Sequence, residues 1–155
     1  MTVAHHRKPV SVATLADAEA VIRNRGLRVS TARRLLLEVL LSADRPVSAE
    51  ELAGGLEGAL PGGDLPSVYR NLETLEQLGL VHHMHLGHGP GLYELAGRSA
   101  AREYLVCDRC RAVTAVEASE LDDVRAEIER RFMFAARFDH FPVVGLCHKC
   151  RDVEE

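Results

Sequence analysis

Two short cysteine pairs constrain this chain more than any other feature of its sequence. Cys107 and Cys110 form one Cys-x-x-Cys motif, Cys147 and Cys150 form a second, and together they are all four cysteines of the chain. Two residues between ligands let both sulfurs of a pair reach one ion, and four thiolates complete the tetrahedral shell of a structural zinc site. We therefore expect these four residues to bind one zinc ion per chain.

Other uses of paired cysteines are possible at this point. A thioredoxin-like dithiol would need only one such motif, and disulfides are rare in a reducing cytosol. The first eight residues lack the apolar core of a signal peptide, and no apolar run approaches the roughly 20 residues of a membrane span. We therefore expect a cytoplasmic protein without a membrane segment.

A local cluster of positive charge stands out against the acidic composition of the chain. A net charge of −4 gives no general attraction to nucleic acid, so a DNA-binding surface would have to be local. The only dense positive stretch contains Arg23, Arg25, Arg28, Arg33 and Arg34. This cluster at the junction of two expected helices is either a solvated face or a phosphate-binding surface.

Apolar residues at helical spacing predict four helices in the first part of the chain. The first covers about residues 14–25, and the second follows a cap at Ser30 or Thr31. The third opens at the capping box that Ser48 begins, and it continues to about Leu60. In the second helix the expected buried stripe consists of Leu35, Leu36, Val39 and Leu40.

The fourth helix, at about 66–78, carries a candidate recognition surface. Its apolar positions, which should be buried, are Val68, Leu72, Leu75 and Leu78. The outward positions are then Ser67, Arg70, Asn71 and Thr74, with Tyr69 at the edge. Such a face suits a DNA major groove, where an aromatic ring presses against thymine methyls and an arginine holds phosphate. Taken alone, it is also typical of an ordinary solvated helix.

A hairpin and a linker follow the fourth helix. Strands are expected at 80–86 and 92–95 around a glycine-rich turn, and helices followed by such a hairpin are typical of a winged helix. The small residues 96–101 predict a hinge. The expected fold is therefore α/β (α+β), with a winged-helix DNA-binding domain at 1–95 and a small α/β dimerisation domain with a four-cysteine zinc site at 102–155.

The last third of the chain is expected to depend on zinc and on a second copy. It should contain strands at 103–106 and 113–117, a helix at 119–132 and one or two strands within 135–144. In that helix, Leu121, Val124 and Ile128 are expected to face inward. So few large apolar residues make a weak core, which zinc and dimerisation would stabilise. A homodimer would place two recognition helices on a palindromic site.

This order of parts resembles the ferric uptake regulator family of metal-dependent repressors. The similar segments are Gly26–Ser30 with Arg33, Ser67–Leu72, Leu105–Cys107 with Cys110, and Gly145–Cys147 with Cys150. The resemblance implies that Arg28 reaches into or beside the minor groove, that Arg33 and Arg70 contact the DNA backbone, and that Tyr69 touches bases. Ser67 and Asn71 belong to the same recognition signature. A homodimer on a palindromic, AT-rich operator is implied as well.

The sensory site departs from the family pattern. Members usually carry a histidine-rich run before the segment that starts at Leu105, but this chain has Ser99-Ala100-Ala101-Arg102-Glu103-Tyr104 there. Pro46 stands where a histidine usually precedes the third helix. One metal site that is common in the family should therefore be absent or weakened.

Histidines in the hairpin offer another set of ligands. Because strand side chains alternate, His83 and His85 share a face while His82 points away. With His140 they are similar to the nickel ligands of nickel-responsive family members. Three imidazoles without a thiolate favour nickel, copper or zinc over iron. We therefore expect a nickel-dependent repressor of metal-uptake or metal and oxidative-stress genes, in which the metal favours a closed, DNA-binding form.

Several alternatives stay open. A mixed site of His85, Glu94, Asp122 and His140 would sense iron or zinc, and a degenerate site would leave DNA binding without a regulatory metal. A zinc-ribbon module that binds another protein is the alternative from a different class. The sequence has no nucleophile with a base at local spacing, no phosphate loop and no dinucleotide fingerprint, so we do not expect an enzyme.

Overall fold

The computed structural model describes residues 8–55, 64–87, 89–99 and 102–152. The chain divides into two compact units, and the hairpin is shared between them. The first unit contains residues 1–83 and 91–98, and the second contains residues 84–90 and 99–155. The predicted continuation of the third helix to Leu60 lies outside the described residues.

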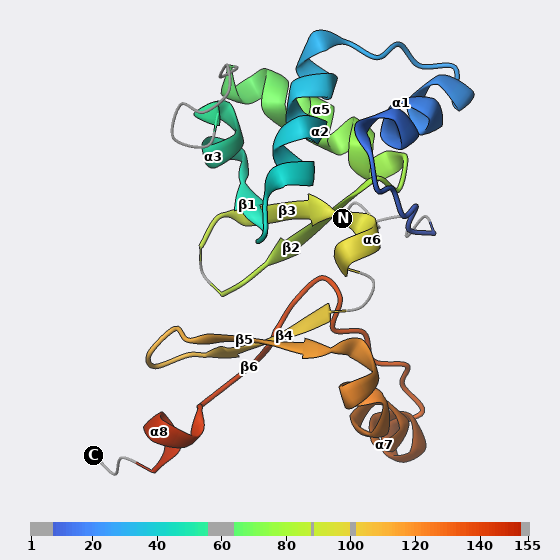
Figure 1. Ribbon diagram of the computed structural model, residues 1–155. Coiled ribbons are helices and arrows are strands. Elements are labelled where there is room, and N and C mark those ends of the chain that lie inside the picture. The colour runs from blue at the N-terminus through green and yellow to red at the C-terminus, as the bar shows by residue number, and fades with distance from the viewer. Residues whose placement is uncertain (1–7, 56–63, 88, 100–101, 153–155) are drawn as a thin grey trace. The chain divides into compact units, whose positions relative to one another are not determined.

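The first unit consists of short helices and a small sheet (Figure 1). Its elements are α1 (Leu15–Asn24), α2 (Thr31–Ser42), β1 (Val47–Ser48), α3 (Ala49–Ala53), α5 (Leu65–Gln77), β2 (Val81–His85), β3 (Gly91–Leu95) and α6 (Ala96–Ser99). The last two residues of β2 group with the second unit. The expected helices and hairpin are therefore present, and the two-residue strand β1 is an addition.

Helices of this unit begin where the sequence supplies a cap. The side chains of Thr14, Ser30, Ser48 and Asp64 each accept a hydrogen bond from the backbone amide three residues later. These bonds satisfy amide groups that the first turn of a helix leaves without a partner. Ser48 and Glu51 form the predicted capping box at the start of α3.

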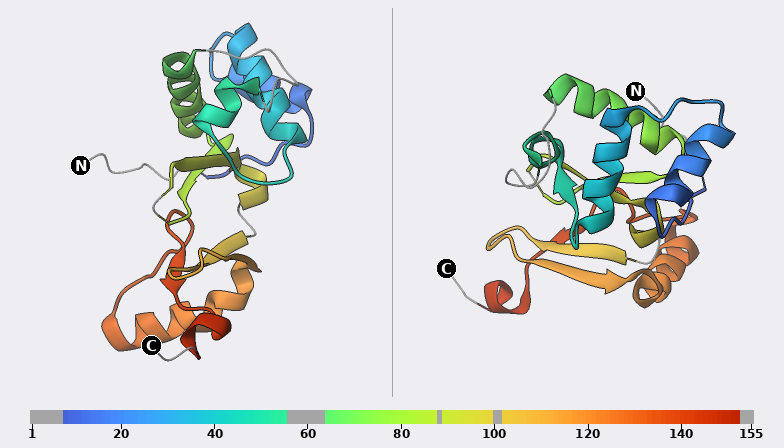
Figure 2. Two further views of the ribbon diagram at one scale, coloured as in Figure 1. Left: turned by 90° about the vertical axis from the view of Figure 1, so that its left-hand side faces the viewer. Right: turned by 45° about the horizontal axis from the view of Figure 1, so that its top comes forward.

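One apolar core joins the helices to the sheet, whose strand order is β1-β3-β2. The helices α2 and α5 lie on one side of this sheet (Figure 2). Its largest fully buried side chains are Ile22, Leu37, Leu40, Val47, Leu72, Leu75 and Leu80. The four apolar positions predicted for the recognition helix are all buried. The stripe predicted for α2 was partly wrong, because Leu35 is only half-buried while Leu37 is fully buried. Both α1 and α5 contact α2, so the buried face of α2 includes Leu37 and differs from the predicted stripe.

The turn after α5 and the start of the expected hinge are both held to the first unit. Gly79 has φ +77°, a conformation that favours glycine, and its carbonyl accepts a 2.9 Å hydrogen bond from the Val10 amide. The predicted linker begins instead as the helical turn α6. There Arg98 donates hydrogen bonds to the carbonyl oxygens of Leu41, at 2.9 Å, and Ala43 at the end of α2. The side chain of Arg98 thus joins α6 to the first unit.

The second unit is built on a three-stranded sheet of order β5-β4-β6. Its elements are β4 (Arg102–Cys107), β5 (Val113–Glu117), η1 (Ala118–Leu121), α7 (Asp122–Phe132), β6 (Val143–Gly145) and α8 (His148–Arg151). β4 lies between an antiparallel β5 and a parallel β6. The strands predicted at 103–106 and 113–117 are confirmed, but the strand predicted within 135–144 begins only at Val143.

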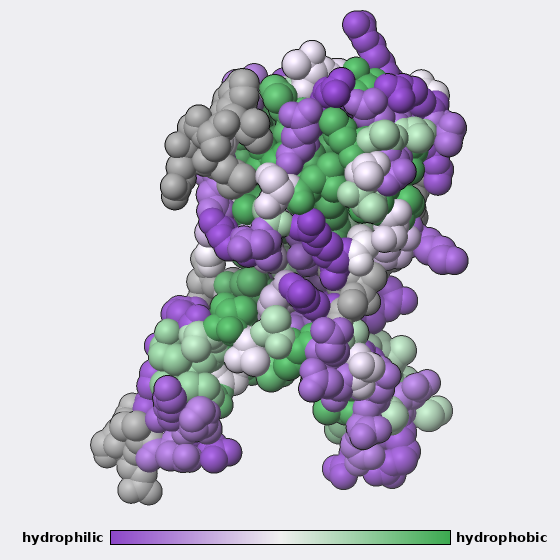
Figure 3. Space-filling view, viewed as in Figure 1, coloured by the Kyte–Doolittle hydropathy of each residue, from purple (hydrophilic) through white to green (hydrophobic). Residues whose placement is uncertain are grey.

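Many apolar side chains of the second unit are exposed on its own surface (Figure 3). The large ones are Val113, Val124, Phe132, Met133, Phe134, Phe141, Val143, Val144 and Leu146. The prediction that Val124 faces inward was wrong, since 47% of this residue is exposed. Among the described elements α7 contacts mainly η1, so the side of the helix that carries Val124 stays largely exposed. Among the described residues, no helix has both the length and the apolar character needed to cross a bilayer.

Candidate metal centre and nucleic-acid interface

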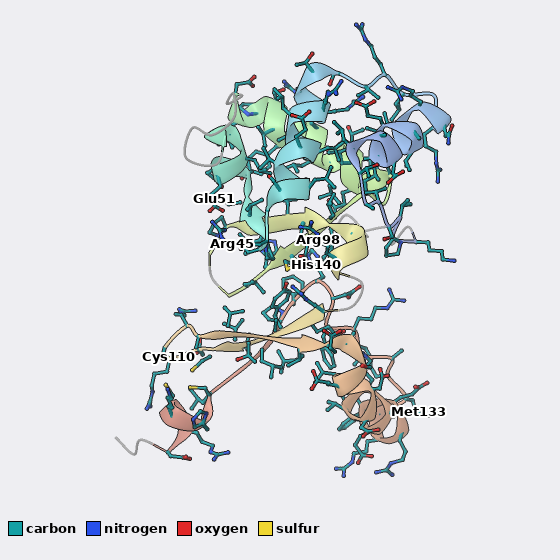
Figure 4. All side chains as sticks on the ribbon, in the orientation of Figure 1. Arg45, Glu51, Arg98, Cys110, Met133 and His140 are labelled. Carbon is teal, nitrogen blue, oxygen red and sulfur yellow. The ribbon has the colours of Figure 1, made fainter. Side chains whose placement is uncertain are left out.

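Pairing of β4 with β6 brings the two cysteine motifs together. Cys107 is the last residue of β4 and lies opposite Gly145, the last residue of β6. Since the two strands are parallel, the segments that follow them leave the sheet at the same end. Cys110 lies in the turn after β4, and Cys147 and Cys150 lie at the start of α8 and within it. Figure 4 shows the sulfur atoms gathered there, near the labelled Cys110.

The four thiols have the spacing of a tetrahedral zinc shell. All four sulfur atoms lie within 4.8 Å of one another, and the Sγ atoms of Cys110 and Cys147 are 3.8 Å apart. Zinc–sulfur bonds of about 2.3 Å in a tetrahedron require sulfur–sulfur separations of about 3.8 Å. The donor set and its geometry therefore fit a structural zinc ion.

Backbone hydrogen bonds support the same cluster. The amides of Cys110 and Cys147 each lie 3.5 Å from the Sγ of Cys107, and these bonds lower the pKa of the Cys107 thiol to about 6. Burial, followed by hydrogen bonds with the other three thiols, raises the pKa of Cys150 to about 12. A divalent cation would favour the thiolate form of all four groups. The guanidinium of Arg109 ties the two knuckles together by donating to the Cys150 carbonyl at 3.1 Å.

Two of the three predicted nickel ligands are neighbours within the second unit. The rings of His85 and His140 meet edge to face with 5.7 Å between centroids, and the His85 amide donates to the His140 carbonyl at 3.1 Å. Phe141 contacts both imidazoles, with ring centroids 5.8 Å from His85 and 4.6 Å from His140. His85 and Phe141 also line a hollow of about 300 Å³ beside Arg111. Both imidazoles are half-buried, so they are accessible to an ion.

The third predicted ligand, His83, makes a contact of its own in the first unit. Its ring stacks on Tyr93, with 4.6 Å between centroids and 8° between planes. Burial raises the pKa of Tyr93 to about 12. Across the residues that the structure describes, the four cysteines are the only group of three or more potential ligands close enough to share an ion. His88 lies outside the described residues.

The second-choice ligands Glu94 and Asp122 lie in different units. Glu94 is buried on β3. Asp122, at the start of α7, is bound by Arg125, whose guanidinium lies 2.7 Å from its carboxylate. The same guanidinium pairs with the buried carboxylate of Glu103 and lies over the ring of Phe138 at 5.5 Å. An arginine thus already supplies a positive charge to Asp122.

The basic cluster separates into paired and unpaired arginines. Arg23 and Arg34 form ion pairs with acidic residues of α1 and α2, at distances of 2.6 to 3.7 Å. Arg33 donates a 2.7 Å hydrogen bond to the Arg28 carbonyl and so braces the loop that carries Arg28. Arg25 and Arg28 are exposed, and within the described part of the chain neither forms an ion pair. The positive charge that is available to a ligand therefore lies at the loop between α1 and α2.

The outward face of α5 has both accessible and internally bonded side chains. Arg70 is exposed and makes no ion pair with any described residue. Tyr69 is 43% exposed, and its hydroxyl donates a 3.2 Å hydrogen bond to the carboxylate of Glu50 on α3. Ser67 and Asn71 are half-buried, and the Asn71 amide donates to the Ser67 carbonyl at 2.9 Å. Arg70 and Tyr69 are thus the best placed of the predicted DNA contacts.

Three functional contacts were not predicted from the sequence: Glu50 with Tyr69, Glu103 with Arg125, and Arg98 with the end of α2. The members of each pair are separated by 19 to 57 positions. None shows a helical or strand period that would link its partners. The acidic residue two positions after the Ser48 cap was visible, but nothing local indicated that it meets a recognition helix.

Comparisons with known proteins agree with this architecture. Residues 24–141 match the family model described as the ferric uptake regulator family. The ferric uptake regulation protein of Bacillus subtilis is 32% identical over 130 residues, which are 82% of this chain and 87% of that protein.

Two solved structures are similar as well. The ferric uptake regulator of Helicobacter pylori aligns with a TM-score of 0.68 at 20% identity, covering 96% of this chain and 100% of that chain, so it shares the fold. A zinc uptake regulator in complex with zinc and DNA aligns with a TM-score of 0.55 at 29% identity, covering 89% of this chain and 93% of that chain.

Proposed function

The chain belongs to the ferric uptake regulator family of metal-responsive transcriptional regulators, and we propose that it is a cytoplasmic repressor whose hold on DNA depends on a bound metal. Family members are dimeric DNA-binding regulators and not enzymes. The observation that carries the proposal is a group of exposed arginines, Arg25, Arg28 and Arg70, on the unit that also carries the recognition helix. None of the three forms an ion pair with a residue that the structure describes. In a chain of net charge −4, such cations are suited to phosphate.

We propose two kinds of DNA contact: contacts with the DNA backbone, which position the protein, and contacts with bases, which recognise the sequence. We assign backbone contacts to Arg70 and base contacts to Tyr69, as expected of side chains near the start of a recognition helix. Arg28 would enter or border the minor groove, and Arg33 would hold its loop as well as reach a phosphate. Ser67 and Asn71 bond to each other, so we assign them a supporting role.

The second unit would supply dimerisation. Four cysteines at zinc spacing close one end of its sheet, and apolar side chains of β5 and β6 such as Val113 and Val144 are exposed. A second copy would cover this surface and present two recognition helices to a palindromic, AT-rich operator. We place the domain boundary within residues 96–101.

Regulation would come from a metal bound by His85 and His140, with His83, two positions earlier on β2, as the third ligand. The 5.7 Å approach of the two rings supports this assignment. Imidazole nitrogens favour nickel, copper or zinc over iron, so nickel is the first candidate. A metal that binds one form of the protein about a hundredfold better favours that form by about 2.7 kcal/mol, enough to switch occupancy of an operator.

Zinc is the second candidate for the regulatory metal. The zinc uptake regulation protein of Escherichia coli is 30% identical over 90% of this chain, and zinc is also a ligand for imidazole. Iron is less well supported, because the carboxylate of Asp122 is already paired with Arg125.

The experiment that tests the regulatory metal measures operator affinity with and without nickel, zinc or iron, after the operator has been selected from random duplexes. His140→Ala and His83→Ala should abolish the response to nickel while basal zinc content stays at about one ion per chain. His82→Ala is the matched control, since its side chain points away from the expected face. An unchanged metal response in both variants would overturn the assignment.

The DNA surface is tested by salt dependence. Arg70→Ala should weaken operator binding and lower the slope of log affinity against log salt by about one. Arg130→Ala, an exposed arginine of α7 paired with Glu127, is the control and should leave the slope unchanged. Equal slopes for the two variants would contradict the proposed interface.

A further inference from the structure

A hydrogen bond between Tyr69 and Glu50 determines which hydrogen-bonding groups the recognition helix presents. Tyr69 lies in the second turn of α5 and is 43% exposed, while Glu50 lies in the first turn of α3. The hydroxyl and the carboxylate are 3.2 Å apart. The two residues are 19 positions apart, so this is a tertiary contact between the two helices.

The direction of this hydrogen bond follows from the two groups. A carboxylate has no proton to donate, so the Tyr69 hydroxyl must be the donor. Its single proton is then committed to Glu50, and its oxygen faces the ligand only as an acceptor. Desolvation, the charge of Glu50 and the hydrogen bond to it all raise the pKa of Tyr69, which keeps the proton on the phenol.

Glu50 is held in place by the residues around it. Ser48 caps α3, and Glu51 in the same turn accepts a hydrogen bond from the Ser48 amide. The carboxylate of Glu51 also pairs with Arg45 at 2.6 Å (Figure 4). Strand β1, which ends at Ser48, is paired with β3 through Val47 and Tyr93. The start of α3 is therefore fixed to the sheet, and Glu50 offers a positioned acceptor to the tyrosine.

We propose that Glu50 is a specificity-determining residue that makes Tyr69 an acceptor-only reader of base edges. In the major groove the only hydrogen-bond donors are the amino groups of adenine and cytosine. Phosphate oxygens, guanine O6 and N7, and thymine O4 are acceptors, and an acceptor-only hydroxyl gains nothing from them. The carboxylate itself repels phosphate, which disfavours binding in the wrong register. This inference rests on the proposed DNA-binding function of α5.

The test removes single amino groups from the selected operator. Adenines are replaced by purine and cytosines by 2-pyrimidinone, one position at a time, and the affinity of the full-length protein is measured for each duplex. Wild-type protein should lose about three- to tenfold at one position of each half-site, as expected for one hydrogen bond. Tyr69→Phe, which lacks the hydroxyl, should lose less than about twofold at that position. Glu50→Ala frees the hydroxyl to donate as well as accept, so relative to the selected operator it should bind a duplex with guanine or thymine at that position at least about threefold better than wild-type protein does.

Controls separate this inference from the proposed function. Glu73→Gln removes one negative charge from an exposed position of α5 and should keep the wild-type position profile. If Arg70→Ala weakens binding but Glu50→Ala discriminates against guanine and thymine at that position as strongly as wild-type protein does, or if wild-type protein shows no sensitive position, Glu50 has no such role. If Arg70→Ala and Tyr69→Ala both bind the operator as wild type does, the proposed function itself is wrong.

Discussion

The two units of this protein are stabilised in different ways. In the first unit, the apolar faces of α1, α2 and α5 meet the sheet in one core, and residues such as Leu72 and Leu75 are completely buried. In the second unit, Tyr104, Val106 and Cys107 are the buried apolar residues of the sheet, while β6 is exposed along its whole length. The first unit can be stable through its own side chains, whereas we expect the second to depend on a metal ion and a second copy.

Removal of one zinc ligand should have the largest effect and should be confined to the second unit. Cys147→Ser leaves three thiolates, and structural zinc contributes about 10–16 kcal/mol of apparent binding free energy at pH 7. We expect loss of zinc, loss of the dimer, and rapid hydrogen exchange in β4 to β6, with α1, α2 and α5 still protected. Metal analysis, sedimentation and hydrogen-exchange mass spectrometry report these changes.

The control for the zinc ligand is a neighbouring residue of the first knuckle. Asp108→Asn changes an exposed side chain whose ion pair with Arg111 is a long 3.7 Å contact. It should retain zinc and the dimer. If Cys147→Ser instead unfolded both units together, the contrast between the two units would be wrong.

Truncation of a core side chain in the first unit should destabilise that unit and leave the second unit unaffected. Leu72 is 0% exposed at the centre of the first unit, so Leu72→Ala should lower the free energy of unfolding of that unit by about 2–5 kcal/mol. Leu72→Met, which conserves volume, should cost less than about 1.5 kcal/mol. Zinc content should remain at the wild-type level in both variants. Urea unfolding followed by hydrogen exchange in each unit would show whether the loss stays in the first unit.

The same contrast explains how much of the structure could be predicted from sequence. The elements of the first unit follow local signals, such as the caps at Ser30 and Ser48 and the apolar spacing of Val68, Leu72 and Leu75. The zinc cluster was equally visible, because a ligand pair is a local pattern whose partner is another pair of the same kind. Local rules therefore predicted the helices, the hairpin and the cluster of four cysteines.

Local rules could not predict features that depend on residues far away in the sequence or on the packing of whole elements. Val124 has the spacing of a buried residue, but it is exposed because α7 contacts mainly η1 among the described elements. The contacts of Glu103 with Arg125 and of Tyr69 with Glu50 are tertiary contacts that periodicity does not encode. Sequence therefore predicted which residues could form a site better than it predicted which partner each would take.

An ion pair of the second unit should have an intermediate effect. Arg125→Ala leaves the carboxylate of Glu103, which is only 5% exposed, without its positive partner, and this should cost about 2 kcal/mol of stability. Arg130→Ala removes an exposed pair on the same helix and should have a much smaller effect, because solvent screens the pair. Thermal unfolding of the zinc-loaded dimer measures both. Equal costs would indicate that Glu103 is not held by charge.

The smallest effect should come from the capping box of α3, and it should depend on pH. Glu51 accepts a 2.8 Å hydrogen bond from the Ser48 amide, and Glu51→Ala should cost the first unit about 1 kcal/mol at pH 7. Hydrogen bonds from Arg45 and then from the Ser48 amide lower the pKa of the Glu51 carboxyl below its usual value near 4.5. A lowered pKa means that the charged form stabilises the folded state above that usual value, and that this contribution disappears as pH falls through the folded-state pKa.

The difference between wild type and Glu51→Ala in urea unfolding should therefore shrink as the pH is lowered below about 4.5. Glu51→Gln is the matched variant, because an amide oxygen can still accept from the Ser48 amide but does not titrate. Its cost should be smaller at pH 7, and the stability that Glu51 adds over glutamine should vanish in acid. A pH-independent difference between wild type and Glu51→Gln would show that the charge of Glu51 does not stabilise this helix start, and that Ser48 alone fixes the position of α3 beside the recognition helix.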